Sequence, residues 1–388
     1  MLSLRLRTTP LVMLLALLGA GCGVFENDCD GRDAGCEPLG WFPYLFHRCP
    51  AIHPALINLP VFGQVSTFAG QAGSPGGTDG TGTAAQFQGP NGMTGDGYNI
   101  YMVEGGGHRV RRIHVASAAV ALLAGTGVGG SADGPQGTAQ FQGPTAITTD
   151  CTNLYVTDGG NHTIRTVSIA SGYTTTLAGQ VGNNAEIDGV GTAAAFNNPR
   201  GITTDSANLY VSDFMGHTVR RVDLGTARVT TIAGQAGVPG TADGPLGTNL
   251  LDGPAGLALD GRYLYLTNYN RHTLRRLDLV TLELTTVAGL AGTSGSTDGV
   301  GLNARFNQPL QLFRDRNYIY ATEMGNNIVR RISLTDIDVQ TLAGLAPGGA
   351  TVDGFGSAAS FNGLTGIASS YESLFVGEFS SHVMRKIQ

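Results

Sequence analysis

The amino-acid sequence predicts an all-β protein, a closed six-bladed β-propeller made of four-stranded antiparallel blades. Three observations support this prediction. Short β-rich runs alternate with Gly, Asn and Asp, no stretch shows helical periodicity, and an Ala-Gly pair returns at intervals of 54 or 55 residues. The pairs are Ala69-Gly70, Ala124-Gly125, Ala178-Gly179, Ala233-Gly234, Ala288-Gly289 and Ala343-Gly344. Small twisted sheets can bury both faces only against neighbours, so we expect six units to form a ring.

The two ends of the repeat region predict how the ring closes. Val65–Phe68 resembles the fourth strand of a unit, whereas His382–Ile387 resembles a third strand. If the two pair, all six blades are complete and no strand edge stays open.

The N-terminus indicates export. Residues 1–21 contain Arg5 and Arg7 followed by a short apolar stretch, as in a signal peptide, and residues 22–62 form a cysteine-containing tether before the propeller at 63–388. The stretch ends at Cys22 in a sequence similar to a bacterial lipobox, so Cys22 is the predicted lipidation site. A plain secretory signal is the alternative. We expect an outer-membrane or periplasmic lipoprotein, or an extracellular protein, with contact to the membrane only through a lipid anchor.

The remaining cysteines fit an oxidising compartment. Cys29, Cys36, Cys49 and Cys151 allow three disulfide pairings. We favour Cys29 with Cys36, because they bracket a tight acidic turn, which leaves Cys49 to pair with Cys151.

Composition narrows the classes of partner. The net charge is −6, only 13% of the residues are charged and no basic block occurs, which disfavours nucleic-acid binding. We expect a monomer.

Several units resemble NHL-repeat propellers, whose blades read Pro-x-Gly-Ile, Leu-Tyr-Val-x-Asp and Asn-His-x-Ile-Arg. Asn161-His-Thr-Ile-Arg165 with Asp158 matches this pattern, as does Asn198-Pro-Arg-Gly-Ile202 with Asp213. The resemblance covers residues 65–388. It implies the propeller fold but no particular activity, because such propellers include binding modules and a few enzymes.

Most polar residues recur in every unit, and we assign these a structural role. Acid–histidine pairs four residues apart, such as Asp158 with His162, bracket the turn between strands two and three. Third-strand arginines are predicted to form hydrogen bonds between blades, to carbonyls and carboxylates. An aspartate precedes glycine in each Gly-rich loop, which fits a turn better than a calcium site, because each loop offers a single acid. Calcium is therefore only a weak cofactor candidate, and no metal-ligating or catalytic residues are assigned.

Positions at which the units differ are the candidate ligand-binding residues. The loops before strand one and the turns after strand two lie on one face. The candidates on that face are Arg200, Phe214, Met215, Tyr269, Arg271 and Phe379. Aromatic residues and arginine are enriched at binding hot spots.

Two functions remain open. The regular blades favour a non-enzymatic binding or scaffold propeller on the bacterial cell envelope, which holds a protein or glycan on the loop-bearing face. The alternative is a hydrolase or lyase similar to lactonase or amidating-lyase propellers, with a metal on the ring axis. Such an enzyme requires acids or histidines that break the six-fold pattern.

Overall fold

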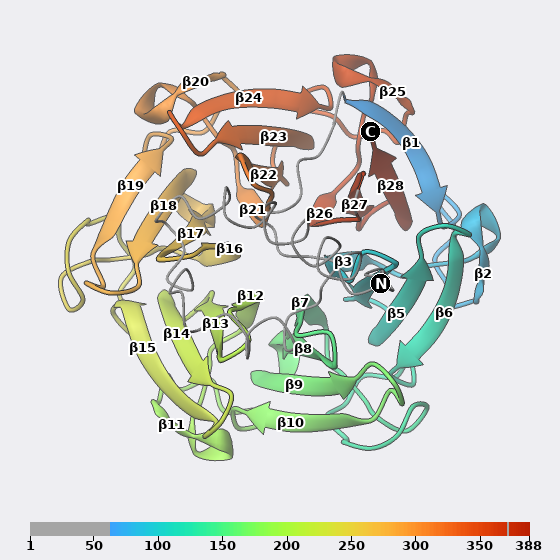
Figure 1. Cartoon of the computed structure of the whole chain (residues 1–388), viewed down its shortest axis with the longest axis horizontal. Coiled ribbons are helices and arrows are strands. Elements are labelled where there is room, and N and C mark those ends of the chain that lie inside the picture. Colours follow the sequence, from blue (N-terminus) through green and yellow to red (C-terminus); the bar gives the residue numbers. More distant parts are fainter. Residues whose placement is uncertain (1–62, 371) are drawn as a thin grey trace, which may run out of the picture.

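The protein is described by a computed structural model, which covers residues 63–370 and 372–388. Six antiparallel sheets surround a central axis, and Figure 1 shows them in chain order around a ring. The described residues contain strands and a few three-residue 3-10 helices, so the predicted all-β six-bladed propeller is confirmed. None of the described residues form a helix long and apolar enough to cross a membrane.

Each blade runs outward from the axis through four antiparallel strands. The innermost strands are β3 (Pro90–Gly95), β7 (Pro144–Thr149), β12 (Pro199–Thr204), β16 (Pro254–Asp260), β21 (Pro309–Arg314) and β26 (Leu364–Ser369). The second strands are β4 (Asn99–Glu104), β8 (Asn153–Asp158), β13 (Asn208–Asp213), β17 (Tyr263–Asn268), β22 (Tyr318–Glu323) and β27 (Leu374–Glu378). The third strands are β5 (Arg109–His114), β9 (Thr163–Ser168), β14 (Thr218–Asp223), β18 (Thr273–Asp278), β23 (Ile328–Ser333) and β28 (Val383–Ile387). The fourth strands are β6 (Ala119–Ala124), β10 (Thr174–Ala178), β15 (Arg228–Gly234), β19 (Leu284–Ala288), β24 (Asp338–Ala343) and β1 (Gln64–Ala69).

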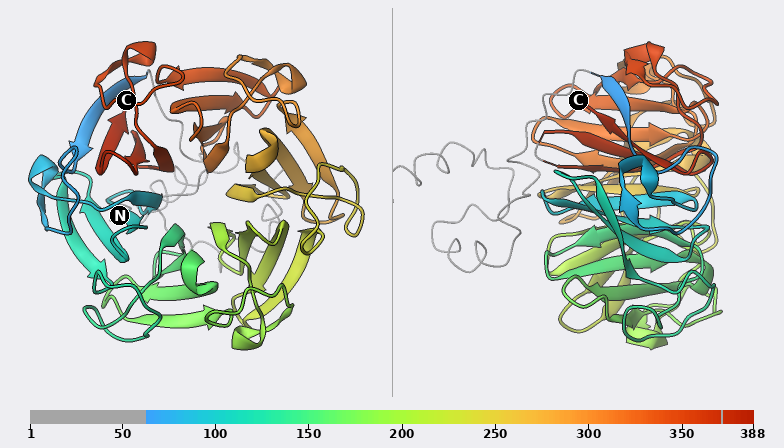
Figure 2. Two further views of the ribbon diagram at one scale, coloured as in Figure 1. Left: turned by 180° about the vertical axis from the view of Figure 1, so that it is seen from behind. Right: turned by 90° about the vertical axis from the view of Figure 1, so that its right-hand side faces the viewer.

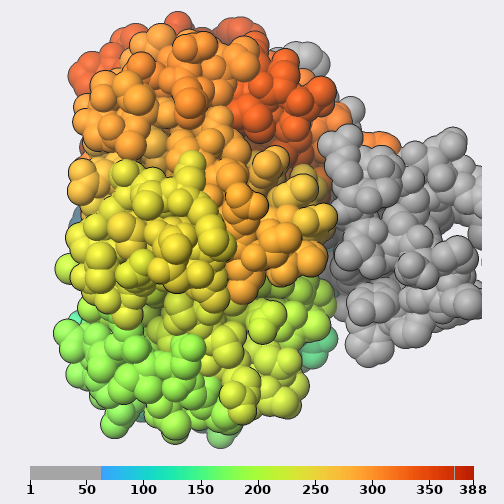
Figure 3. Space-filling model, turned by 90° about the vertical axis from the view of Figure 1, so that its left-hand side faces the viewer, coloured from blue at the N-terminus to red at the C-terminus, as the bar shows by residue number. Residues whose placement is uncertain are grey.

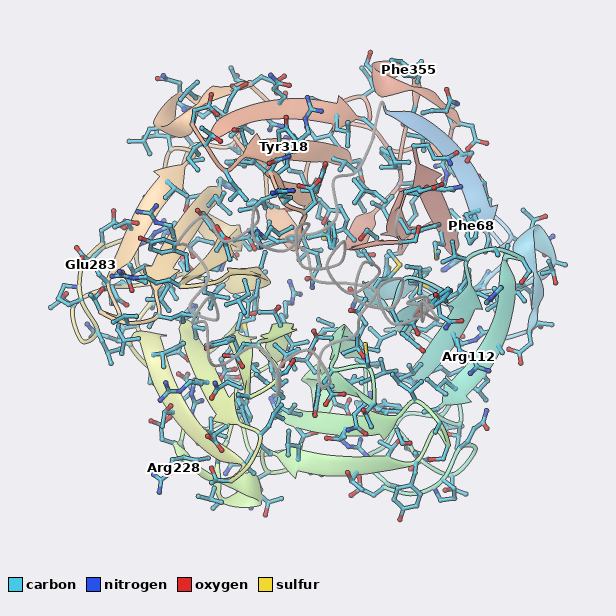
Figure 4. All side chains as sticks on the ribbon, in the orientation of Figure 1. Phe68, Arg112, Arg228, Glu283, Tyr318 and Phe355 are labelled. Carbon is cyan, nitrogen blue, oxygen red and sulfur yellow. The ribbon has the colours of Figure 1, made fainter. Side chains whose placement is uncertain are left out.

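Ring closure occurs in the sixth blade, where the first strand completes the last sheet. β1 pairs antiparallel with β28, and Val65 lies opposite Ile387. Phe68, labelled in Figure 4, packs edge-on against Phe375 with ring centroids 5.0 Å apart. The predicted pairing of the two ends is therefore confirmed.

Four blades carry a fifth, outermost strand of two residues that the sequence did not predict. These strands are β2 (Gly80–Thr81), β11 (Gly189–Val190), β20 (Gly299–Val300) and β25 (Gly354–Phe355). In the second and fourth blades a proline, Pro135 or Pro245, follows the Asp-Gly pair, and only an isolated bridge forms there. Proline has no N–H to donate to a strand ladder, which explains the missing strand.

The apolar core consists of six clusters, and each cluster lies between two adjacent blades. Each second strand contributes an aromatic residue to these clusters; the six residues are Tyr101, Tyr155, Tyr210, Tyr265, Tyr320 and Phe375. Several tyrosine hydroxyls also donate to the aspartate of the turn between strands one and two, for example Tyr155 to Asp150 at 2.7 Å. In the sixth blade, Phe375 lacks the hydroxyl and Ser370 stands in place of the aspartate. Figure 3 shows adjacent blades in contact along the rim.

The strands run between two faces of a flat disc, seen edge-on in Figure 2. Each first strand begins on the face where the second strand ends, since Pro199 pairs with Asp213. We call this face, which carries the Gly-rich loops and the turns between strands two and three, the loop face. The turns between strands one and two, and between strands three and four, lie on the opposite face.

A buried arginine on each third strand fastens the Gly-rich loop to its blade. Arg330 is typical: it donates to Glu323 at the end of β22 at 2.5 Å and to the loop residue Asp298 at 2.8 Å. It also donates to two loop carbonyls and lies over the Phe306 ring. The six arginines are Arg111, Arg165, Arg220, Arg275, Arg330 and Arg385, all almost fully buried. The predicted bonds to carbonyls and carboxylates are thus confirmed, but they form within a blade rather than between blades, because the Gly-rich loop folds back onto the blade that carries the arginine.

Several predictions fall on residues that the structure does not describe. The signal peptide, the tether, lipidation of Cys22, and Cys29, Cys36 and Cys49 all lie within 1–62. Cys151 is described, in the turn between β7 and β8 with φ 74°, and its amide donates to Thr149. Both disulfide pairings remain predictions.

The arginine clamp can be tested by comparing two adjacent blades. Arg330→Gln leaves the fully buried Glu323 without its cation, which should reduce the free energy of unfolding by about 3–5 kcal/mol. Arg275 is the matched control, because its second strand ends in the uncharged Asn268 rather than an acid. Urea unfolding followed by circular dichroism should show a smaller loss for Arg275→Gln. Equal losses would contradict the role given to the buried ion pair.

Candidate functional site

The first residue of the turn between strands two and three differs among the blades. In ring order these residues are Gly105, Gly159, Phe214, Tyr269, Met324 and Phe379. Large side chains therefore stand on four consecutive blades of the loop face, and glycines stand on the other two. We call the four large residues the apolar arc. In the first and second blades, glycine adds no side chain at this turn position.

Arg200 is the second residue of the innermost strand β12, and it contacts the apolar arc. Its guanidinium carbon lies 4.0 Å from the centroid of the Phe214 ring and 5.7 Å from that of Tyr269. The two rings meet edge to face with centroids 5.7 Å apart. Three of the predicted binding residues, from two blades, thus form one cluster.

The backbone holds this cluster in place. The Arg200 carbonyl accepts from the Thr157 hydroxyl at 3.2 Å, and the following amide, that of Gly201, donates to Ser212 at 2.7 Å. Gly201 has no room for a side chain, since a Cβ there would lie 1.9 Å from the Ala255 carbonyl oxygen. Arg200 is therefore presented from a tightly packed strand rather than from a loose loop.

The other predicted binding residues have separate environments. Arg271 forms an ion pair with Asp252 at 2.6 Å, so its charge is already neutralised within the fourth blade. Met215 follows Phe214 in the chain and is 54% exposed, so its side chain is accessible to a partner. Phe379 is 38% exposed, but its ring lies over Gly89 and Gly105 of the first blade. It belongs to the apolar arc without touching the Arg200 cluster.

Two residues of this region were missed by the sequence analysis. The Met324 sulfur accepts a hydrogen bond from the Tyr269 hydroxyl at 3.5 Å, and this contact extends the cluster into the fifth blade. Asn91 occupies the register of Arg200 on β3, and its side-chain amide forms no hydrogen bond within the described part of the chain. Both positions could have been found by aligning the units on Phe214 and Arg200.

Glu186 also breaks the repeat, and it too was missed. It occupies a loop position that holds glycine, serine or threonine in the other units. Burial, followed by the nearby Asp213, raises the pKa of Glu186 to about 7, and its Oε2 is buried without a partner among the described residues. The third blade, which also carries Arg200 and Phe214, thus departs from the repeat at three positions on or near the loop face.

The histidines of the acid–histidine pairs join neighbouring blades. The Nδ1 of His162 accepts from the amide of Asn198 in the next blade at 3.1 Å. The same bond is made by His108, His217, His272 and His382, and by the Asn327 side chain in the fifth blade. All six residues have φ between 54° and 62°. The structural assignment is correct, and the left-handed backbone at these positions directs the imidazole to the next blade rather than to the acid of its own turn.

The loop aspartates likewise serve the blades. Asp133 accepts from Arg165 at 2.6 Å, and its other oxygen accepts from the Thr176 amide of the fourth strand at 3.0 Å. Among the described residues, no group of three or more His, Cys, Asp or Glu side chains is arranged to hold a metal ion.

One cavity, of about 190 Å³, is found on the opposite face of the fifth blade. It is lined by polar residues and by Tyr318, which Figure 4 labels, with Arg331 stacked on the tyrosine ring at 4.9 Å. It lies away from Arg200 and the apolar arc, so it is no part of the predicted site.

Two curated relatives share sequence with the repeats, although no family model matches the chain. The protein Suppressor of Quenching 1, chloroplastic, of Arabidopsis thaliana is 29% identical over 301 residues, 70% of this chain and 28% of its own length. NHL repeat-containing protein 2 of Bos taurus is 31% identical over 160 residues, 38% of this chain and 22% of its own length. The chain thus spans less than a third of the length of each relative. The similarity establishes homology to NHL repeat-containing proteins.

Solved structures share the fold. A protein of unknown function from Bacteroides thetaiotaomicron has a TM-score of 0.66 and 21% identity over 84% of this chain and 75% of its own. An auxiliary nutrient binding protein from the same species has a TM-score of 0.63 and 19% identity over 84% and 76%. A gluconolactonase from Xanthomonas campestris has a TM-score of 0.53 and 14% identity over 87% and 97%. At these identities the likeness shows the fold alone.

The histidine bond between blades predicts a dependence of stability on pH. Burial lowers the pKa of His162, so protonation is harder in the folded chain than in the unfolded one. The contribution of neutral His162 to the free energy of unfolding is therefore fully present above about pH 6.5 and is lost as the pH falls through the lower pKa of the folded chain. In His162→Asn the acceptor is kept, as in the native Asn327, but it does not titrate. Urea unfolding between about pH 7.5 and about pH 5 should show a smaller loss of stability for the variant than for the wild type. An equal loss would show that His162 makes no such contribution.

Proposed function

We propose that this chain, which is homologous to NHL repeat-containing proteins, is a non-enzymatic binding propeller that captures a partner on its loop face. The observation that carries the proposal is the Arg200, Phe214 and Tyr269 cluster. Its residues occur where the repeats differ, on a face built from otherwise equivalent loops. Aromatic rings packed around an arginine are typical of the centre of a binding interface.

A ring of regular blades supports binding rather than catalysis. The histidines and acids that recur around the ring already bond to amides, arginines or turn residues. Auxiliary nutrient binding proteins of Bacteroides share the fold, which supports the capture of a ligand by such a ring. A protein segment and a glycan are both candidate partners at this level.

Display on the bacterial envelope is the second part of the proposal. The apolar leader followed by Cys22 supports attachment of a lipid, and the four remaining cysteines fit an oxidising compartment. The tether of residues 22–62 would then separate the ring from the membrane surface.

An enzyme with a metal on the ring axis is the competing function, because lyase and gluconolactonase propellers share the fold. Elemental analysis of the purified chain distinguishes the two functions. A metal bound in stoichiometric amount would contradict the non-catalytic proposal.

The binding face can be tested on peptide and glycan arrays probed with the purified propeller. Replacing both rings, Phe214→Ala with Tyr269→Ala, should weaken retained binders by about 30-fold or more, the effect of losing a hot spot worth about 2 kcal/mol. Tyr173→Ala is the matched control, because this tyrosine is 50% exposed in a turn between strands three and four on the opposite face. Unchanged binding by the double variant would place the partner elsewhere.

Lipid attachment can be tested separately. In a bacterial host, the wild type should incorporate labelled palmitate and sediment with membranes, because an acylated cysteine anchors the chain. Cys22→Ser should abolish the label and release the protein. If the wild-type protein is secreted without the palmitate label, the leader is a plain secretory signal instead.

A further inference from the structure

The Arg200 guanidinium is a cation without a counterion. The six buried arginines of the third strands each bond a carboxylate and at least one carbonyl of the Gly-rich loop. Arg200, in contrast, forms no ion pair and its guanidinium donates no hydrogen bond to any described residue. A half-buried guanidinium with all its donors unused is costly to the free protein, because hydrogen bonds to water are partly lost and none replace them.

Packing on the rings fixes this cation in an orientation that suits a ligand. A guanidinium stacked 4.0 Å from a ring centroid keeps its N–H groups in its own plane, so stacking on Phe214 leaves the donors available. Burial lowers the pKa of Arg200, and no carboxylate acts against this effect. The planar fork of donors matches a carboxylate in geometry and charge.

The surroundings favour a protein partner over a glycan. Phe214, Tyr269, Met215 and Met324 present aromatic and thioether surface, and this composition is enriched at protein interfaces. A sugar needs several polar side chains to replace the water on its hydroxyls. Near the ring axis, at the register of Arg200, two threonine hydroxyls are already bonded: Thr145 donates to the Pro199 carbonyl and Thr365 to that of Pro90. Besides Arg200, only the Asn91 amide offers unused polar groups at this register among the described residues, which is fewer than a sugar requires.

We propose that Arg200 binds a carboxylate on a protein segment whose neighbouring apolar side chain packs against the apolar arc. This inference rests on the proposed function, since it names the ligand chemistry of the same site. The carboxylate can come from an acidic side chain or from a chain terminus, and the chemistry at Arg200 is shared by both. Its charge would neutralise Arg200, which the described residues leave without an anion on the loop face.

The test uses small probes that isolate this chemistry. N-acetylphenylalanine carries a terminal carboxylate beside an aromatic side chain, and N-acetylphenylalanine amide is its neutral match. Acetyl-Phe-Glu-Phe-amide supplies the carboxylate from a side chain. Binding to the full propeller is followed by ligand-observed NMR and isothermal titration up to about 10 mM, a range that detects millimolar affinity. The carboxylate probes should bind at least tenfold more tightly than the neutral amide, and less tightly as salt is added.

Variants then assign the effect to Arg200. Arg200→Gln should reduce the affinity of the carboxylate probes at least tenfold and leave the amide unchanged, whereas Arg200→Lys should retain part of the affinity. Arg228→Gln is the matched control for charge in the same blade; Figure 4 labels this exposed residue at the rim. Thermal unfolding of each variant verifies that the ring is intact.

The outcomes separate this inference from the proposed function. Equal binding of acid and amide, undiminished binding by Arg200→Gln, or no binding of either carboxylate probe would overturn carboxylate recognition. In those cases the array experiment with the ring variants still decides whether the loop face binds a partner. Galacturonate and galactose form the glycan arm, and retention of galacturonate alone would overturn the assignment to a protein segment. Preference for one carboxylate probe identifies the side-chain or the terminal source.

Discussion

The buried arginine of each third strand is the interaction on which the rest of the ring depends. The Gly-rich loops are long and poor in apolar residues, so they have little surface with which to pack. One arginine, exemplified by Arg165, joins the loop aspartate, two loop carbonyls, the acid at the end of strand two and the loop phenylalanine. The loop is thereby fixed without a large core of its own. In five of the six blades, removing the cation would leave a buried acid unpaired; the fourth blade has the uncharged Asn268 at this position.

Once the loops are fixed, contacts between blades close the ring. Histidines with left-handed backbone accept hydrogen bonds from amides of the next blade. Hydroxyls such as that of Thr267 donate to a carbonyl of the next innermost strand, here that of Leu310 at 2.9 Å. The apolar clusters lie at the same junctions. The polar residues that recur in every unit thus stabilise the junctions between neighbouring blades. This leaves only residues that break the repeat, Arg200 and Phe214 among them, free for a ligand.

The large turn residues that depart from the repeat lie on neighbouring blades. The apolar arc occupies four adjacent blades, and Arg200 lies against its first two members. Glu186, buried near Asp213, adds a third departure from the repeat in the same blade as Arg200. In a ring of identical blades, all blades offer a partner the same surface. The Arg200 cluster makes one part of the loop face different from the rest, so that a partner can bind there specifically.

The sequence by itself determined the six units, their strand order and the pairing of Val65 with the last strand, because these follow from spacing and apolar alternation. It also marked Arg200, Phe214 and Tyr269 by their departure from the repeat. Only the tertiary structure decided that these three touch, that Arg271 is neutralised by Asp252 and that Phe379 lies apart over the first blade. The contacts between blades, such as Phe214 with Tyr269, depend on the rotation that brings equivalent positions of neighbouring units together, and packing at the junctions sets this rotation. The contact of Arg271 with Asp252 lies within one blade and depends on how the Gly-rich loop folds back onto the turn, which no local sequence pattern specifies.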